Sequence, residues 1–226
     1  MWSFPERGNW ATHNGAYRGN WSPYVPRNLL LQYSQTGEWV LDQFVGSGTT
    51  LIEAKLLNRN AIGVDINSEV IALAEEKLNF VSETSSKIVL RNANACNLSF
   101  IKNSSIDFIC THPPYADIIK YSRNLDGDIS LHSWEEFLLD MRKVAEESFR
   151  VLKKDKMCAV MMGDIRKKGK VIPLGFYVME RFMQTGFSLK EIIIKEQHNC
   201  RSSKYWKGQQ KKFLMLAHEY IFVFQK

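Results

Sequence analysis

The chain of 226 residues carries 30 Lys and Arg against 24 Asp and Glu, a formal net charge of +6, and 45% of its residues are hydrophobic. These values suit one α/β domain of ordinary globular composition. They exclude a membrane span, because no apolar run approaches the roughly 20 residues required. The N-terminus lacks the apolar core of a secretion signal, and the four cysteines form no C-x-x-C pair. We therefore expect a cytoplasmic protein with reduced thiols, without a metal site or a membrane partner.

Residues 1–36 are rich in Trp, Asn, Gly, Pro and Arg, which predicts an ordered arm with one helix near "PRNLLLQY". Beyond the arm, short apolar runs alternate with segments of helical periodicity. The predicted strands are 39–44, 61–66, 87–92, 105–111, 157–164, 187–197 and 212–226. The predicted helices are 48–60, 68–81, 133–154 and 172–186, with Ser68 capping the second and a Ser133–Glu136 capping box opening the third.

Strands that alternate with helices predict a parallel sheet with helices on both faces. The last two predicted strands follow each other without a helix, so we expect them to form an antiparallel pair at one edge. The predicted fold class is α/β: a Rossmann-like, mostly parallel seven-stranded sheet with an antiparallel C-terminal pair. The chain shows no repeat and no domain boundary, which indicates a single domain over 1–226.

A glycine turn follows the first predicted strand. In "LDQFVGSGTTLIEA", Gly46 and Gly48 stand between a strand and a helix, where parallel sheets bind ligands. The turn lacks the lysine of a phosphate loop, and Leu51 stands where a dinucleotide fingerprint has its third glycine. The next strand ends near Asp65, whose carboxylate can accept hydrogen bonds from two ribose hydroxyls. The turn therefore predicts a nucleoside site without a pyrophosphate.

The stretch Thr111–Tyr115, "THPPY", follows another apolar strand. Neither Pro113 nor Pro114 has an N–H to donate to a sheet, so the strand must end here. Because proline fixes φ, the two prolines also hold the backbone in one conformation. The motif therefore predicts a stiff corner that presents His112 and Tyr115 at the end of a strand.

These motifs resemble those of the S-adenosylmethionine-dependent methyltransferases that modify exocyclic amines of DNA bases. The family's cofactor turn is F-x-G-x-G-[ST]-T and its catalytic motif is [DNS]-P-P-[YFW], and the similarity covers residues 20–165. The resemblance implies the class I methyltransferase fold, S-adenosyl-L-methionine as cofactor, DNA as partner, and an arm over 1–36 that flanks the cofactor. The cofactor-binding residues that it implies are Trp21, Tyr24, Asp42, Phe44, Gly46, Gly48, Thr49, Thr50, Asp65, Asn67 and Asn94.

The resemblance also implies how the corner acts. An exocyclic base amine is a poor nucleophile because its lone pair is delocalised into the ring. Two hydrogen-bond acceptors aimed at its N–H groups would hold it in line with the methyl sulfonium. In the family these acceptors are the side chain at the first motif position and the carbonyl of the first proline, while the aromatic residue stacks on a flipped base. The implied catalytic residues are His112, Pro113, Pro114 and Tyr115.

His112 departs from the family, in which Asp, Asn or Ser is usual. A neutral imidazole can accept one hydrogen bond through its unprotonated nitrogen, whereas an imidazolium can accept none. We therefore predict that His112 is the acceptor and that activity falls as the pH drops through its pKa, so that a flat profile across pH 5–8 would contradict the role. The alternatives are that the proline carbonyl acts alone or that the chain is an inactive relative.

Two segments are candidates for DNA contact: 116–134, and the basic and aromatic loop 198–212. The basic run "RKKGK" at 166–170 also suits phosphates, although a solvated loop explains it equally well. Because these segments are short, we expect that the region that recognises DNA is itself short, is shared across a homodimer, or is supplied by a separate specificity or restriction subunit. The implied DNA-binding residues are Lys120, Tyr121, Arg201, Lys204, Tyr205, Trp206 and Lys207.

The target amine stays open between cytosine N4 and adenine N6. Because "THPPY" is closer to the T-S-P-P-Y form common among cytosine N4 enzymes, we favour cytosine. Two other readings remain: methyl transfer to RNA bases or to a protein glutamine, and a cofactor-binding or DNA-binding subunit without chemistry of its own.

Overall fold

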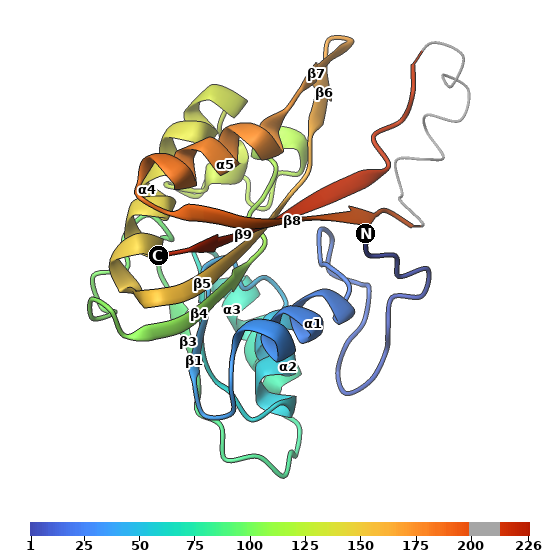
Figure 1. Ribbon diagram of the computed structural model, residues 1–226. Helices are drawn as coiled ribbons and strands as arrows, with labels where there is room; N and C mark the ends of the chain where they lie inside the picture. The colour runs from blue at the N-terminus through green and yellow to red at the C-terminus, as the bar shows by residue number, and fades with distance from the viewer. Residues whose placement is uncertain (199–212) are drawn as a thin grey trace.

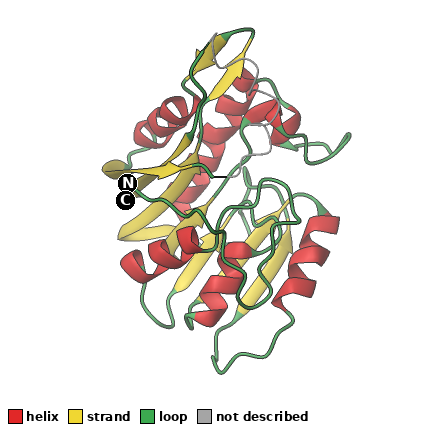
Figure 2. Ribbon diagram, turned by 90° about the vertical axis from the view of Figure 1, so that its right-hand side faces the viewer, coloured by secondary structure: helices red, strands yellow, loops and turns green. Residues whose placement is uncertain are grey.

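The computed structural model describes residues 1–198 and 213–226. A seven-stranded sheet in the order β3-β2-β1-β4-β5-β9-β8 forms its centre, and helices cover both faces (Figures 1 and 2). The five strands from β3 to β5 run parallel, whereas β9 pairs antiparallel with β5 and with β8. This arrangement confirms the predicted Rossmann-like α/β fold with its antiparallel C-terminal pair.

Most elements of this sheet and its helices lie close to the predicted ranges, but β5 begins at Leu152, where a helix was predicted to continue to 154, and β9 begins at His218 instead of 212. The strands are β1 (Trp39–Asp42), β2 (Asn60–Asp65), β3 (Ile88–Asn92), β4 (Ile106–Thr111), β5 (Leu152–Met162), β8 (Ser188–Glu196) and β9 (His218–Gln225). The α-helices are α1 (Tyr24–Tyr33), α2 (Thr49–Leu56), α3 (Ser68–Leu78), α4 (Trp134–Val151) and α5 (Leu174–Gln184), and the 3₁₀ turns are η1 (Ala116–Ile118) and η2 (Ile129–Leu131).

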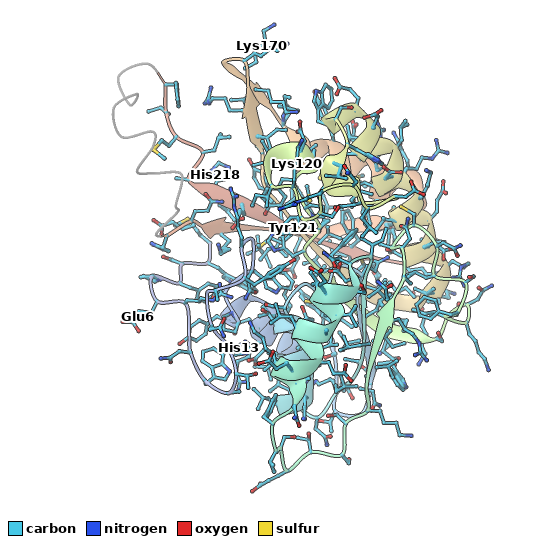
Figure 3. All side chains as sticks on the ribbon, turned by 180° about the vertical axis from the view of Figure 1, so that it is seen from behind. Glu6, His13, Lys120, Tyr121, Lys170 and His218 are labelled. Atoms are coloured by element: carbon cyan, nitrogen blue, oxygen red, sulfur yellow. The ribbon has the colours of Figure 1, made fainter. Side chains whose placement is uncertain are left out.

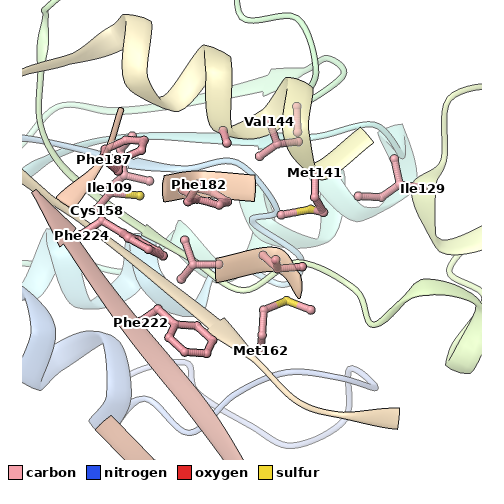
Figure 4. Close-up of a cluster of buried hydrophobic side chains, with 14 of the residues drawn as sticks. Ile109, Ile129, Met141, Val144, Cys158, Met162, Phe182, Phe187, Phe222 and Phe224 are labelled. Carbon is pink, nitrogen blue, oxygen red and sulfur yellow. The ribbon is translucent and has the colours of Figure 1, made fainter. Parts of the chain in front are cut away.

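Two apolar cores, one on each face, hold the sheet between its helices. Met141 of α4 and Phe182 of α5 pack on one face with Phe224 of β9 (Figure 4). Leu29 of α1 and Leu51 of α2 belong to the core on the other face. All six residues of β4 are buried, which explains why its apolar residues do not alternate with exposed ones, and its two polar residues, Asp107 and Thr111, have partners inside the protein. The proline motif therefore follows a strand that is fixed from both sides.

The helix starts show one correction and one confirmation. Asn67, not Ser68, caps α3, because its side chain accepts a hydrogen bond from the Glu69 N–H at 3.0 Å. The predicted capping box of α4 is present: the Ser133 hydroxyl accepts from the Glu136 N–H, and the Glu136 carboxylate accepts from the Ser133 N–H.

The basic run at 166–170, for which no strand was predicted, lies in a two-stranded hairpin of β6 (Ile165–Lys167) and β7 (Lys170–Ile172). Lys168 and Gly169 both have positive φ, +48° and +79°, so glycine supplies part of the tight connection. The hairpin projects from the body of the protein, and Lys170 lies near its tip (Figures 1 and 3).

Trp2, near the N-terminus, exchanges backbone hydrogen bonds with Ile194 and Glu196 of the edge strand β8. The predicted DNA-binding residues Arg201, Lys204, Tyr205, Trp206 and Lys207 lie outside the described residues. Within the part of the chain that the structure describes, no helix is both long enough and apolar enough to cross a membrane.

Candidate active site

The glycine turn and the proline motif meet at the carboxyl ends of the neighbouring parallel strands β1 and β4. A cavity lies between them, at the position where parallel α/β sheets bind ligands. The predicted site residues that line this cavity are Trp21, Asp42, Phe44, Gly46, Thr49, His112, Pro113, Pro114 and Tyr121. The two motifs thus contribute to one site, although more than 60 residues separate them.

The glycine turn has the conformation that its sequence requires. Gly46 and Gly48 have φ of +49° and +87°, and Gly48 immediately precedes α2. A Cβ on Gly46 would lie 3.2 Å from the ring of Tyr17 in the arm. The Asp65 carboxylate, at the end of β2, accepts hydrogen bonds from the N–H groups of Gly46 at 3.1 Å and Asn67 at 3.0 Å. Asp65 therefore holds the turn itself.

Asp42 ends β1 and is 2% exposed, with both carboxylate oxygens in hydrogen bonds. They accept from the Thr50 hydroxyl at 2.5 Å, the Thr111 hydroxyl at 2.9 Å and the Phe44 N–H at 3.1 Å. Burial raises the pKa of Asp42 to about 6, and these neutral donors offset only part of that effect. The hydrogen bond from Thr111 to Asp42 links the end of β4, just before the two prolines, to the end of β1, just before the glycine turn. One side-chain hydrogen bond therefore connects the two motifs.

His112 packs against Trp21 of the arm, with ring centroids 5.3 Å apart and an angle of 23° between the planes. Burial lowers the pKa of His112 to about 4, so the imidazole is neutral at physiological pH. The expected loss of activity on protonation therefore moves below pH 5. With this pKa, a His112 acceptor predicts a flat profile between pH 5 and 8, and the acceptor role of His112 stays a prediction.

Tyr115 is held by residues from the far end of the chain. Its hydroxyl lies 2.9 Å from His112 Nε2 and donates to Glu219 Oε1 at 2.8 Å. Glu219 in turn accepts from the Lys195 ammonium at 2.7 Å. The Tyr115 ring packs on Gly163, where a Cβ would lie 2.8 Å from Cε2, so this position has no room for a side chain. Nothing in the local sequence around "THPPY" indicates these contacts.

The arm supplies cavity residues that sequence reasoning missed: Tyr17, Gly19 and Asn20. The rings of Tyr17 and Tyr121 stack with centroids 6.0 Å apart, and a Cβ on Gly19 would collide with the Tyr121 hydroxyl. Tyr121, predicted to contact DNA, thus forms part of the cavity wall with the arm. The only sequence signal for these residues was the aromatic and glycine content of 1–36.

Several predicted cofactor residues lie outside the cavity lining. Tyr24 stacks on Phe4 at 5.3 Å, away from the proline motif. Asn94 accepts from the Cys96 N–H at 2.8 Å, and its amide lies against Gly127. Thr50 supports Asp42, and Gly48, Asp65 and Asn67 shape the turns behind the lining. The predicted DNA-binding residue Lys120 is exposed after η1 (Figure 3).

The profile of the family described as DNA methylase (N6_N4_Mtase) matches residues 1–76 and 106–226. The chain belongs to this DNA methylase family. The match includes the glycine turn, the proline motif and both C-terminal strands, and it confirms the resemblance read from the two motifs.

Individual relatives match shorter pieces of this chain, which spans only part of their length. It is 38% identical over 77 residues, 34% of the chain, to the type II methyltransferase M.MthZI of Methanothermobacter thermautotrophicus, and covers 21% of that protein. It is 30% identical over 123 residues, 54% of the chain, to a tRNA (guanine(10)-N2)-dimethyltransferase of the same species, and covers 34% of it. Its fold is similar to a SAM-dependent methyltransferase of Methanosarcina mazei, with a TM-score of 0.62, 18% identity and coverage of 88% and 96% of the two chains.

S-adenosylmethionine is the cofactor of the DNA methylase family to which the chain belongs. The residues around the cavity fit it. The carboxylate of Asp42 suits its amino group and positive charge, and the aromatic rings suit its sulfonium and adenine. The Ser47 hydroxyl lines the cavity, is buried, and has no hydrogen-bond partner among the described residues, so it is available to a bound polar group.

Proposed function

We propose that this protein transfers the methyl group of S-adenosylmethionine to an exocyclic amine of a flipped DNA base, with cytosine N4 favoured over adenine N6. The observation that carries the proposal is the junction of the cofactor turn and the proline corner through the Thr111–Asp42 hydrogen bond. In this proposal the bond holds the cofactor turn next to the groups that would bind the amine.

When bound, the cofactor supplies an electrophilic methyl group on its sulfonium. The protein's own residues then act on the amine. In this proposal His112 and the Pro113 carbonyl accept hydrogen bonds from its two N–H groups, which draws the nitrogen toward sp³ geometry. A neutral imidazole is required for this role, and the lowered pKa of His112, which arises from its burial, supplies one. Tyr115 stacks on the flipped base and offsets part of its unstacking cost.

The DNA backbone would lie across exposed cations beside the corner. Lys168 and Lys170 are exposed on the β6–β7 hairpin, and Lys120 is exposed after the proline motif (Figure 3). The hairpin is joined to that segment, because the Lys167 ammonium donates to the Asp117 carboxylate at 2.7 Å. These groups suit phosphates, which position DNA without reading its sequence. Sequence recognition by a homodimer or a partner subunit stays part of the proposal.

The favoured base rests on the likeness of "THPPY" to the T-S-P-P-Y form. Thr111 carries that likeness, but its side chain is buried and bonded to Asp42, so the structure adds no contact that would select the base. A second candidate substrate is an RNA base amine. The tRNA dimethyltransferase relative favours it, because that relative aligns with 54% of the chain.

One experiment separates these candidates. The protein is incubated with cofactor and DNA, RNA or protein in parallel, and the products are digested and analysed by mass spectrometry. We expect N4-methylcytosine in DNA; N6-methyladenine in DNA would correct the base only. Methylated RNA or glutamine with unmodified DNA would overturn the proposal. Bound cofactor without any product would favour the binding-subunit reading, with His112→Ala as the matched variant in every arm.

A further inference from the structure

We propose that Glu219, on the last strand, is a positioning residue that fixes His112 in the Nε2–H tautomer, so that Nδ1 is the acceptor nitrogen of the ring. A chain of hydrogen bonds runs from the Lys195 ammonium to the Glu219 carboxylate, then to the Tyr115 hydroxyl, and ends at the His112 ring. The direction of each hydrogen bond in this chain follows from the number of protons that each group carries.

The first link is the charge state of Glu219. Lys195 and Glu219 lie directly opposite each other in the antiparallel pair β8–β9, and their side chains are 13% and 9% exposed. Burial is the largest single influence and would raise the pKa of Glu219, but the Lys195 charge and the hydrogen bonds that Lys195 and Tyr115 donate act against it, and the pKa lies below its ordinary value. An ionised carboxylate has no proton, so both of its oxygens can only accept.

The second link is the phenol. Because Glu219 Oε1 can only accept, the Tyr115 hydroxyl must donate its single proton across the 2.8 Å contact. Burial raises the pKa of Tyr115 well above its ordinary value, which keeps that proton on the phenol. The oxygen of Tyr115 then has only lone pairs left for its second partner, His112 Nε2, at 2.9 Å.

The third link is the imidazole. Nε2 must donate to the Tyr115 oxygen, so it carries the ring proton. Since the ring is neutral, Nδ1 carries the lone pair. The opposite arrangement would place two oxygen lone pairs against each other between Tyr115 and Glu219. The chain of bonds thus makes a histidine behave like the Asp, Asn or Ser side chain expected at this position. That Nδ1 receives the target amine rests on the proposed function, whereas the tautomer does not.

Glu219→Gln tests the direction of the chain with little change in shape. Its amide oxygen is expected to face Lys195, and its NH₂ then donates to Tyr115. The Tyr115 hydroxyl must turn and donate to His112 Nε2, which moves the ring proton to Nδ1. The readout is the ¹⁵N–¹H long-range NMR spectrum of protein labelled in its five histidines, with His112→Asn identifying the signal. We expect Nε2–H in the native protein and Nδ1–H in Glu219→Gln.

A native ring protonated on Nδ1, or an unchanged tautomer in Glu219→Gln, would overturn the proposal. If Glu219→Gln does not fold, Tyr115→Phe decides the case, because it interrupts the chain of hydrogen bonds. The His112 ring should then be a mixture of both tautomers, and a pure Nε2–H signal would contradict the proposal. The matched control is Asp107→Asn, a carboxylate 8% exposed and 2.7 Å from Lys153 at the opposite end of β4, which should leave the signal unchanged.

The activity measurement separates this inference from the proposed function. In single-turnover methyl transfer with saturating cofactor, Glu219→Gln should lose on the order of 100-fold in rate, as expected when one preorganised hydrogen bond to the reacting group is reversed. Cofactor affinity should stay within about twofold, and Asp107→Asn should keep the native rate. If Glu219→Gln moves the ring proton to Nδ1 but leaves the rate unchanged, the assignment of the native tautomer stands and its role in catalysis is refuted. If the native protein methylates no DNA, the NMR result still stands by itself.

Discussion

Two buried carboxylates flank the proline corner, and they are stabilised in opposite ways. Asp42, on the cofactor side, is surrounded by two hydroxyls and one backbone N–H, and burial raises its pKa to about 6. Glu219, on the side of β8 and β9 (the strand-edge side), faces the Lys195 ammonium, and its pKa is lowered because that charge and the hydrogen bonds from Lys195 and Tyr115 act against burial. Both are at least nine-tenths buried, so exposure does not explain the difference.

The difference shows what each side of the corner is built to do. A buried carboxylate without a cation is costly, and a positively charged ligand removes that cost. Asp42 therefore favours a cationic cofactor. Glu219 already has its cation and is free to orient neighbouring hydrogen bonds. Changes on the cofactor side should alter affinity for S-adenosylmethionine, whereas changes on the strand-edge side should alter the rate of transfer.

His112 lies between the two sides, and its loss should have the largest effect. His112→Ala removes the acceptor, and we expect single-turnover methyl transfer to fall by on the order of 100- to 1000-fold. His112→Asn keeps an acceptor oxygen and should lose much less. A rapid-quench assay at saturating cofactor measures both. Equal rates for the two variants would assign the hydrogen bond to the proline carbonyl alone.

Gly46→Ala should act on the cofactor side only. Its Cβ would meet the Tyr17 ring at 3.2 Å from a backbone with positive φ, so the turn must shift. We expect cofactor affinity to fall by about tenfold, equivalent to about 1.4 kcal/mol, in a calorimetric titration. Gly37→Ala is the control, because Gly37 also has positive φ but has open space around it. An equal loss in both variants would show that backbone strain, not the site, was responsible.

Asp42 should make cofactor binding depend on pH. A carboxyl whose pKa is raised to about 6 is protonated below that pH, and a cationic ligand must displace the proton. Affinity should therefore rise with pH up to about 6 and fall by about tenfold for each pH unit below it. Asp42→Asn should remove this slope. With saturating cofactor the rate should stay flat from pH 5 to 8 and decline only near the pKa of His112, about 4, where the ring gains a proton. A slope that survives in Asp42→Asn would assign the proton to another group, such as Asp65.

The smallest effect should come from the hairpin, which belongs to neither side of the corner. Lys168→Ala combined with Lys170→Ala should weaken DNA binding several-fold and lower the slope of log affinity against log salt by about 2. The control pair is Lys87→Ala with Lys102→Ala, two exposed lysines that precede β3 and β4 and so lie toward the amino ends of the parallel strands, away from the carboxyl ends that form the site. The same change of slope in the control pair would show that net charge alone, and not the hairpin, sets the affinity.

Much of this arrangement could be predicted from local sequence. The prolines after "SIDFICT" end a strand, the glycines after "WVLD" make a turn, and parallel strands bring such ends to one edge. Local patterns failed where neighbours in space decided the outcome. The arm's contribution through Tyr17 and Asn20 had no periodic signal. The cap of α3 is a local miss of another kind, because Asn67 and Ser68 are adjacent and both suit a cap, and only the hydrogen bond from the Glu69 N–H to Asn67 decides between them.

The sequence by itself determined the fold class, the family and the two motifs of the site, because prolines, glycines and alternating apolar segments act over a few residues. Only the tertiary structure decided how the unusual histidine is held. Glu219 and Tyr115 are separated by 104 residues, and their contact depends on the register of β9 against β5 and of β5 against β4, whereas the register of β8 against β9 places Lys195 opposite Glu219. That register is fixed by long-range packing, which no local pattern around "THPPY" contains.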